Sequence, residues 1–178
     1  MKRTAMIFSL IFSLAGSLVY AETPPALSDV QLSQIKANCV SIKSTLNRIH
    51  ANDGLVRVNQ GQQYEIISTK LMAPLNSRIA LNRLDGVALS QTTVDYNTQL
   101  DVFRDDYRRY EQSLSELLRF DCLQNPKGFY EKLIEVRKER STVNTTTVQL
   151  KRYIDTYGTQ FDTFRTRQLS IGQGGSAQ

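Results

Sequence analysis

The stretch that decides the fold lies at residues 126–167 and reads PKGFYEKLIEVRKERSTVNTTTVQLKRYIDTYGTQFDTFRTR. Steps of three and four residues connect a row of side chains along all of it: Phe129, Leu133, Val136, Arg140, Val143, Thr147, Leu150, Ile154, Tyr157, Phe161 and Phe164. Only Arg140 and Thr147 interrupt the apolar character of the row. This spacing predicts one helix with a coiled-coil-like seam, roughly 60 Å long at about 1.5 Å per residue. Such a length is unusual for a helix outside a bundle or a coiled coil.

The same spacing recurs upstream in three more segments. In residues 28–52 it connects Leu32, Ile35, Cys39, Ile42, Leu46 and Ile49, after Ser28 as a plausible N-cap. Asn52-Asp53-Gly54 predicts the end of this helix, because these residues favour turns. Residues 55–84 are helical but less regular, with Pro74 expected to kink them and Asp85-Gly86 to stop them. The segment 88–123 carries a clean seam: Tyr96, Leu100, Phe103, Tyr107, Tyr110, Leu114 and Leu117.

We therefore predict an all-α protein, an elongated antiparallel bundle of three to four long helices at about 28–52, 55–84, 88–123 and 126–167. The chain of 178 residues is 40% hydrophobic, enough for one domain with a core. That domain would cover 28–168, after an extended lead-in at 22–27 that holds Pro24-Pro25. The Gly- and Ser-rich end, 169–178, is predicted to be a disordered tail.

The first 21 residues have the features of a secretory signal peptide. Lys2 and Arg3 precede an apolar run that ends in Val19-Tyr20-Ala21, so cleavage is expected after Ala21. The run is short for a span of a bilayer core of about 30 Å, and an uncleaved anchor is the rival interpretation. The formal net charge of +5 falls to +3 once Lys2 and Arg3 are removed. A balance this mild does not favour a nucleic-acid partner, and no later stretch is apolar enough for a stable membrane span.

The two cysteines, Cys39 and Cys122, predict one disulfide in an exported chain. This bond tests the topology, because it needs Cα atoms within about 7 Å. If the first two segments form one helix that folds back near Asp85, the cysteines miss each other by roughly 18 Å. With four separate up-and-down helices they miss by roughly 25 Å. We therefore favour a broken first arm, with a non-helical stretch around Asn52 to Gly61, and keep an intermolecular bond as the alternative.

Residues with catalytic or metal-binding chemistry do not assemble into a recognisable motif. His50 and Asp53 could supply two metal ligands, whereas a zinc site in a protein uses three or four. The acidic rows Glu131, Glu135, Glu139 and Asp101, Asp105 alternate with basic residues, which is typical of a solvated helix face. The tyrosines of the third segment are expected in the core, with their hydroxyls reaching water at its edge. Arg140 in a seam position indicates a residue that sets register or meets a partner.

The expected function is a structural or protein-interaction component of the cell envelope or of an extracellular assembly. We expect a protein that is not an enzyme and uses no cofactor, metal or small-molecule substrate. Its partners would be other proteins, a second copy of the chain included. The alternative hypothesis is a periplasmic holdase chaperone or adaptor, since the exported, long-helical chain is similar in general character to coiled-coil chaperones. That similarity is one of class and rests on no shared motif.

Overall fold

The computed structural model describes residues 27–174, with side chains from 27 to 170. The predicted signal peptide, almost all of the lead-in and residues 175–178 lie outside these described residues. The helices follow in the order α1 (Asp29–Ala37), α2 (Cys39–Ile66), η1 (Ile67–Met72, a π-helical segment), α3 (Ala73–Leu81), α4 (Val87–Arg119) and α5 (Pro126–Gly174). The described chain contains no strand, so the prediction of an elongated all-α bundle is confirmed.

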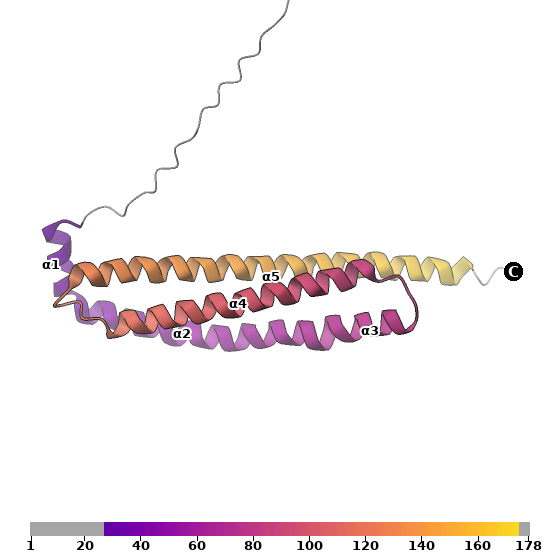
Figure 1. Cartoon of the computed structure of the whole chain (residues 1–178), viewed down its shortest axis with the longest axis horizontal. Helices are drawn as coiled ribbons and strands as arrows, with labels where there is room; N and C mark the ends of the chain where they lie inside the picture. Colours follow the sequence, from indigo (N-terminus) through magenta and orange to yellow (C-terminus); the bar gives the residue numbers. More distant parts are fainter. Residues whose placement is uncertain (1–26, 175–178) are drawn as a thin grey trace, which may run out of the picture.

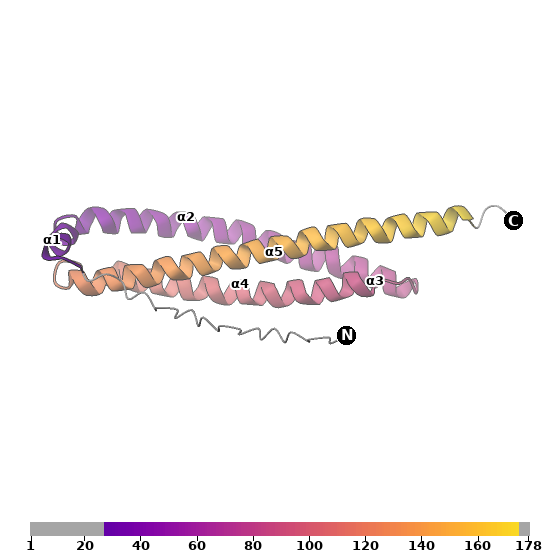
Figure 2. The same cartoon turned by 90° about the horizontal axis from the view of Figure 1, so that it is seen from above.

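Three rods lie side by side along the long axis (Figure 1). The first rod is α2, η1 and α3 together. The chain then turns back into α4, turns again, and returns as α5. At one end α1 stands across the rods, and at the other α5 continues past the turn between α3 and α4 (Figure 2). The antiparallel α4–α5 pair forms the backbone of the bundle, and the first rod packs mainly against α4.

The core follows the seams and divides into two clusters. The seam of α4 is buried throughout, as predicted, with Tyr96 and Leu117 fully covered. One cluster surrounds the Cys39–Cys122 bond and includes Leu46, Tyr110, Leu114 and Phe129. The other lies towards the α3–α4 turn and is built on these residues: Met72, Ile79, Leu89, Tyr96, Leu100, Phe103, Leu150 and Tyr157. Burial of such side chains is worth about 1.5–3 kcal/mol each, so these two clusters hold the rods together.

The predicted helix end at Asn52-Asp53-Gly54 is wrong. α2 runs through all three residues to Ile66, and the break lies earlier, at Asn38, whose N–H bonds to the Gln34 and Lys36 carbonyls. Gly54 keeps a negative φ, so it continues the helix and provides no left-handed stop. Adding a residue to an existing helix is far cheaper than nucleating one, and the side chain of Asp53 bonds across the bundle. The first arm is thus broken, but at Asn38.

A π-helical turn lies just before Pro74, where the sequence predicts a kink. Pro74 stands in the first turn of α3, and the N–H of Ala73 bonds to the carbonyl of Ser68, five residues back. A proline has no N–H to donate and its ring crowds the carbonyl four residues earlier. The wider π turn at Ile67–Met72 is a known way to interrupt the regular ladder without ending the helix.

The stop between α3 and α4 comes before the predicted Asp85-Gly86. The last helical residue is Leu81, and Arg83 takes the left-handed conformation with φ 56°. The N–H groups of Arg83 and Leu84 then bond to the carbonyls of Ala80 and Ile79, both at 3.0 Å. This is the Schellman pattern, which glycine usually completes. Arginine at this position concealed the stop in the sequence.

The disulfide closes within the chain, with the Cα atoms of Cys39 and Cys122 5.8 Å apart. From Leu81 back to Cys39 the helical rise is about 63 Å, and from Val87 to Arg119 it is about 48 Å. The chain after Arg119 is extended at Phe120 and covers up to about 10 Å before Cys122. That extension on the third segment, rather than a gap around Asn52 to Gly61, brings the two cysteines level.

Two further boundaries follow from local chemistry. Asn125 caps α5 as predicted, its side chain accepting from the N–H of Gly128 at 2.9 Å. The far end of α5 passes the predicted end at Arg167 and includes the first residues of the predicted tail, up to Gly174. Helix propagation continues because no proline intervenes. Within the described residues, no helix has the length and apolar content to cross a membrane.

Candidate functional site

Between Leu46 and Tyr64, α2 is held against the bundle mainly by polar contacts, while Tyr64 and Ile67 pack partly buried against a core cluster. Between Leu46 and Ser68 the first rod contributes no buried side chain. Gly54 and Gly61 fall in this stretch, and a Cβ at either position would touch nothing within 4 Å. Each glycine costs a helix about 1 kcal/mol relative to alanine. This stretch is therefore the weakest part of the first rod, and its polar side chains face α4 and α5.

The central polar contact joins Asp53 of α2 to Arg140 of α5. Arg140 donates from Nε to Oδ2 at 2.8 Å and from Nη2 to Oδ1 at 3.0 Å. The hydroxyl of Tyr110 from α4 donates to the same Oδ2 at 2.6 Å. Burial and this bond to Asp53 raise the pKa of Tyr110, while the hydrogen bond to Asp53 raises the pKa of Arg140. The three groups connect all three rods at one level.

A second contact lies one turn nearer the disulfide on α2. The ring of His50 meets the carboxylate of Glu111 on α4, and the hydroxyl of Tyr107 donates to the other oxygen of Glu111 at 3.0 Å. The guanidinium of Arg57 lies over the ring of Tyr107, 4.8 Å from its centre. Burial, followed by the bond to Glu111, raises the pKa of Tyr107. Arg57 thus covers an aromatic side chain whose hydroxyl is engaged on another group.

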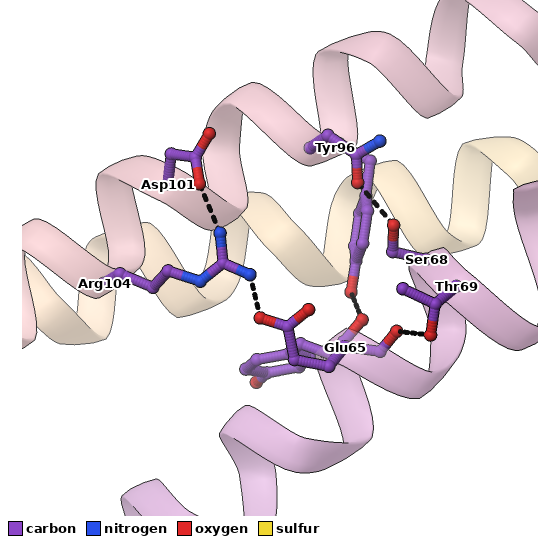
Figure 3. Close-up of polar contacts among 8 residues, drawn as sticks. Glu65, Ser68, Thr69, Tyr96, Asp101 and Arg104 are labelled. Atoms are coloured by element: carbon purple, nitrogen blue, oxygen red, sulfur yellow. Dashed lines mark hydrogen bonds and ion pairs between the residues drawn. The ribbon is translucent and has the colours of Figure 1, made fainter.

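The third contact surrounds the start of the π turn (Figure 3). Arg104 of α4 points between Glu65 of α2 and Asp101 of its own helix, and binds both. Beside it, the hydroxyl of the fully buried Tyr96 donates to the backbone carbonyl of Tyr64 at 3.0 Å, and Ser68 donates to Asn97 at 2.6 Å. The side chain of Thr69 donates to the Glu65 carbonyl at 2.7 Å. Two of these bonds end on backbone carbonyls of α2, and the bond from Ser68 ends on the side-chain amide oxygen of Asn97.

A cavity of about 620 Å³ opens between the three rods at the level of Arg140. Its aromatic floor is Phe103, Tyr107 and Tyr110, and its rim carries three arginines and one aspartate: Arg57, Arg137, Arg140 and Asp53. A second cavity of about 470 Å³ lies on the other side of α2 and shares Arg57, Phe103 and Tyr107 with the first. The volume of the first falls in the range of about 300–1,000 Å³ that ligand sites occupy. The cavity is amphipathic, with an apolar floor and a cationic rim.

The structure shows which groups contact each residue that the sequence singled out. Arg140 lies at the cavity and bridges helices, while Cys39 and Cys122 bond to each other at the end of the bundle. His50 and Asp53 do not act together, since each has its own partner. The tyrosines of the third segment are in the core, but their hydroxyls bond to protein groups: Tyr96 to Tyr64, Tyr107 to Glu111 and Tyr110 to Asp53.

The two acidic rows differ from each other. Asp101 and Asp105 form ion pairs with arginines three residues on, as a solvated face should. Glu131 pairs with Lys127, but Glu139 is half-buried, and one of its carboxylate oxygens has no hydrogen-bond partner among the described residues. Residues 27–174 contain no group of three or more His, Cys, Asp or Glu side chains arranged to hold a metal ion.

Three cavity residues were missed by sequence reasoning: Asp53, Arg57 and Arg137. Asp53 was interpreted as part of a turn, yet it stands four residues after Ile49, the next position of the same seam. A polar residue at that seam position, with Arg140 at a seam position of another helix, was the available signal. The two have opposite charges, which a pairing across the bundle would require. Arg57 and Arg137 carried no signal beyond their charge.

No protein-family model, curated protein or solved structure matches this chain.

Proposed function

We propose that the protein is an exported, non-enzymatic rod that acts as a structural or protein-interaction component of the cell envelope or of an extracellular assembly. Export is supported by the charged and apolar residues 1–21 that end in Ala21, and by the bond between Cys39 and Cys122. Disulfides persist in oxidising compartments and are rare in the cytosol. The partners are other proteins, a second copy of the chain included.

The observation that carries the proposal is an exposed apolar stripe on the outer face of α2. Leu55, Val58 and Ile66 are 67%, 50% and 52% exposed. At 100° per residue, Leu55 and Ile66 lie on the face of α2 opposite the seam positions Leu46 and Tyr64. Val58 lies to one side of them, where it also lines the second cavity. Apolar side chains that gather on a surface instead of lying singly indicate contact with another molecule. A rod with such a stripe suits lateral contact with another protein.

The test is site-specific photo-crosslinking in the producing cell. A photoreactive phenylalanine at position 55 would report the apolar stripe, and one at Arg152, an exposed position on α5, would be the control. The proposal expects discrete protein adducts from position 55, few from position 152, and a mature chain that begins at Glu22 outside the cytoplasm. A chain retained whole in the cytoplasm, or equal and weak labelling from both positions, would contradict it.

The alternative function, a holdase chaperone, uses the same stripe. Exposed apolar side chains on a rigid rod would also bind unfolded clients non-specifically. Purified protein would then suppress the aggregation of an unfolded outer-membrane protein, and Leu55→Ser with Ile66→Ser would reduce the suppression. A specific interaction component gives discrete adducts in the cell and leaves client aggregation unchanged at several-fold excess, so the two functions are distinguishable.

A further inference from the structure

The cavity beside Arg140 has more positive than negative charge. Asp53 is the one acidic residue among its lining groups and is fully engaged by Arg140 and Tyr110. Arg57 and Arg137 also line the cavity, and neither forms an ion pair with a carboxylate among residues 27–170. Two guanidinium groups at one opening, each with several free donors, favour an anion that can accept bidentate hydrogen bonds.

The floor of the cavity adds an apolar requirement. Phe103, Tyr107 and Val143 face the same space, and Val56 stands at its rim half exposed. The hydroxyls of Tyr107 and Tyr110 are already engaged, and the guanidinium of Arg57 lies over the ring of Tyr107, so Phe103 and Val143 supply the apolar surface for a ligand. A carboxylate alone would leave this floor without a partner. The site therefore fits a ligand in which acidic and apolar groups stand next to each other.

The wall of the cavity on the α2 side is the part of the first rod with the weakest hold. The α2 residues that line it lie between Asp53 and Gln60, in the stretch without buried side chains that contains Gly54. A segment that is fixed by a few polar contacts opens more easily than one with an apolar seam. Access therefore does not require disruption of either core cluster.

We propose that this cavity binds an acidic segment of a partner protein, with a carboxylate held by Arg57 and Arg137 and a neighbouring apolar side chain against Phe103 and Val143. This proposal rests on the proposed function, because it assigns the partner class for a protein-interaction component. The choice of a protein segment follows from the charge of the rim, the aromatic floor and the open shape of a cavity lined by three helices. Electrostatic complementarity of this kind sets specificity and the rate of association.

The experiment measures fluorescence anisotropy of three short labelled peptides of equal length with the full mature chain. One alternates Glu with Leu and Phe, one has Gln for each Glu, and one has Lys for each Glu. The proposal expects the acidic peptide to bind at least about tenfold more tightly than the Gln peptide. It also expects Arg57→Gln with Arg137→Gln to weaken the acidic peptide by about tenfold or more. The matched control, Arg152→Gln with Arg165→Gln, removes the same charge away from the cavity and should change little.

A second variant covers the case in which the arginine variant is misfolded. Asn144 lines the cavity and is exposed, so Asn144→Trp would fill the opening without removing a charge, and it should also abolish binding. Equal binding of the acidic and Gln peptides would overturn the proposal. Equal weakening by the cavity and control variants, or binding of decanoate in the cavity while the acidic peptide fails to bind, would overturn it as well.

Failure here is distinguishable from failure of the proposed function. Photo-crosslinking from position 141 in the cell reports the cavity, because Ser141 lines it and is exposed, whereas position 55 reports the apolar stripe on α2. Adducts from position 55 with none from position 141, together with no peptide binding, would leave the interaction function standing and remove the cavity proposal. Adducts from neither position would remove both.

Discussion

Asp53 and Arg140, 87 residues apart in the chain, form a two-point ion pair that fixes the first rod against α5. Each interrupts an otherwise apolar seam, and the pair stands between the two core clusters, in the stretch where α2 has no buried side chain. A polar residue in an apolar seam lowers stability. It also makes one register more favourable than the others, because in every other register it lacks its partner. The pair therefore sets the alignment of α2 with α5.

Removing one partner of this pair should lower stability. Arg140→Gln leaves Asp53, whose side chain is 19% exposed, with only the Tyr110 hydroxyl as a donor. The expected loss is about 1–2 kcal/mol in the free energy of unfolding, measured by urea denaturation, because Arg140 itself is 57% exposed and screened. Arg165→Gln is the control: its pair with Asp162 at 3.2 Å is exposed on both sides, and less than about 0.5 kcal/mol is expected.

A double-mutant cycle separates the pair from other effects of substitution. Asp53→Asn combined with Arg140→Gln should cost clearly less than the two single changes added together, since each removes the same interaction. Additive costs, or an Arg140→Gln loss no larger than that of Arg165→Gln, would mean that the ion pair does not hold the two rods in register.

The fold was predictable because its main signals are long and repetitive. The seams of α4 and α5 each persist through seven or more apolar positions, and no local residue could outweigh them. The helix boundaries were less predictable where turn residues conflicted with a seam. Glycine ends a helix only where no other interaction stabilises its continuation. Here the side chain of Asp53 bonds to Tyr110 and Arg140, and these bonds favour a continuous helix through Gly54. The turn preference of these residues is outweighed by a tertiary contact between residues that are distant in sequence.

The disulfide should stabilise the bundle substantially. The bond between Cys39 and Cys122 closes a loop with a sequence separation of 83 residues. In the chain-entropy model a loop of this length is worth about 4 kcal/mol, although strain and residual structure reduce the figure. Reduction, or Cys39→Ser with Cys122→Ser, should lower the thermal midpoint by many degrees. The variant should keep the helical circular-dichroism spectrum at low temperature, because both core clusters remain.

Size exclusion with light scattering measures the molar mass and so tests whether the bond lies within one chain. An intramolecular bond predicts an unchanged molar mass with and without reductant. A mass that halves on reduction would show that the cysteines join two chains, and a thermal midpoint insensitive to reductant would show that the bond contributes little to the fold.

Arg83→Gly should stabilise the protein. Arg83 holds φ 56°, a conformation that costs a residue with a Cβ roughly 1–2 kcal/mol, and glycine adopts it freely. The greater freedom of glycine in the unfolded chain offsets part of the gain, so a net increase of about 0.5–1 kcal/mol is expected from urea denaturation. Arg78→Gly, inside α3, should have the opposite sign, with a loss of about 1 kcal/mol. A loss at Arg83 equal to that at Arg78 would exclude the left-handed turn.

The candidate site was less predictable than the fold, because it depends on which residues share a level of the bundle. Arg140 was predicted as a register or partner position from its place in the seam alone. Its neighbours in the cavity come from α2 and α4, and only the alignment of three rods brings Arg57, Tyr107 and Arg137 together. That alignment depends on the length of the extended chain at Phe120, which has no clear residue signature.

Alkaline pH should unfold the bundle through its buried tyrosines. Burial, chiefly, raises the pKa of Tyr96, Tyr107 and Tyr110 above the ordinary value of 10.0. In the unfolded chain these groups ionise near pH 10, so the contribution to stability is complete below that pH and is lost as the pH rises above it. Each such tyrosine lowers the free energy of unfolding by up to about 1.4 kcal/mol per pH unit in that window. Absorbance near 295 nm should show a phase of tyrosine ionisation above pH 10 that coincides with loss of helical circular dichroism. A single phase near pH 10, with the helical signal intact, would mean that the α4 tyrosines are open to solvent.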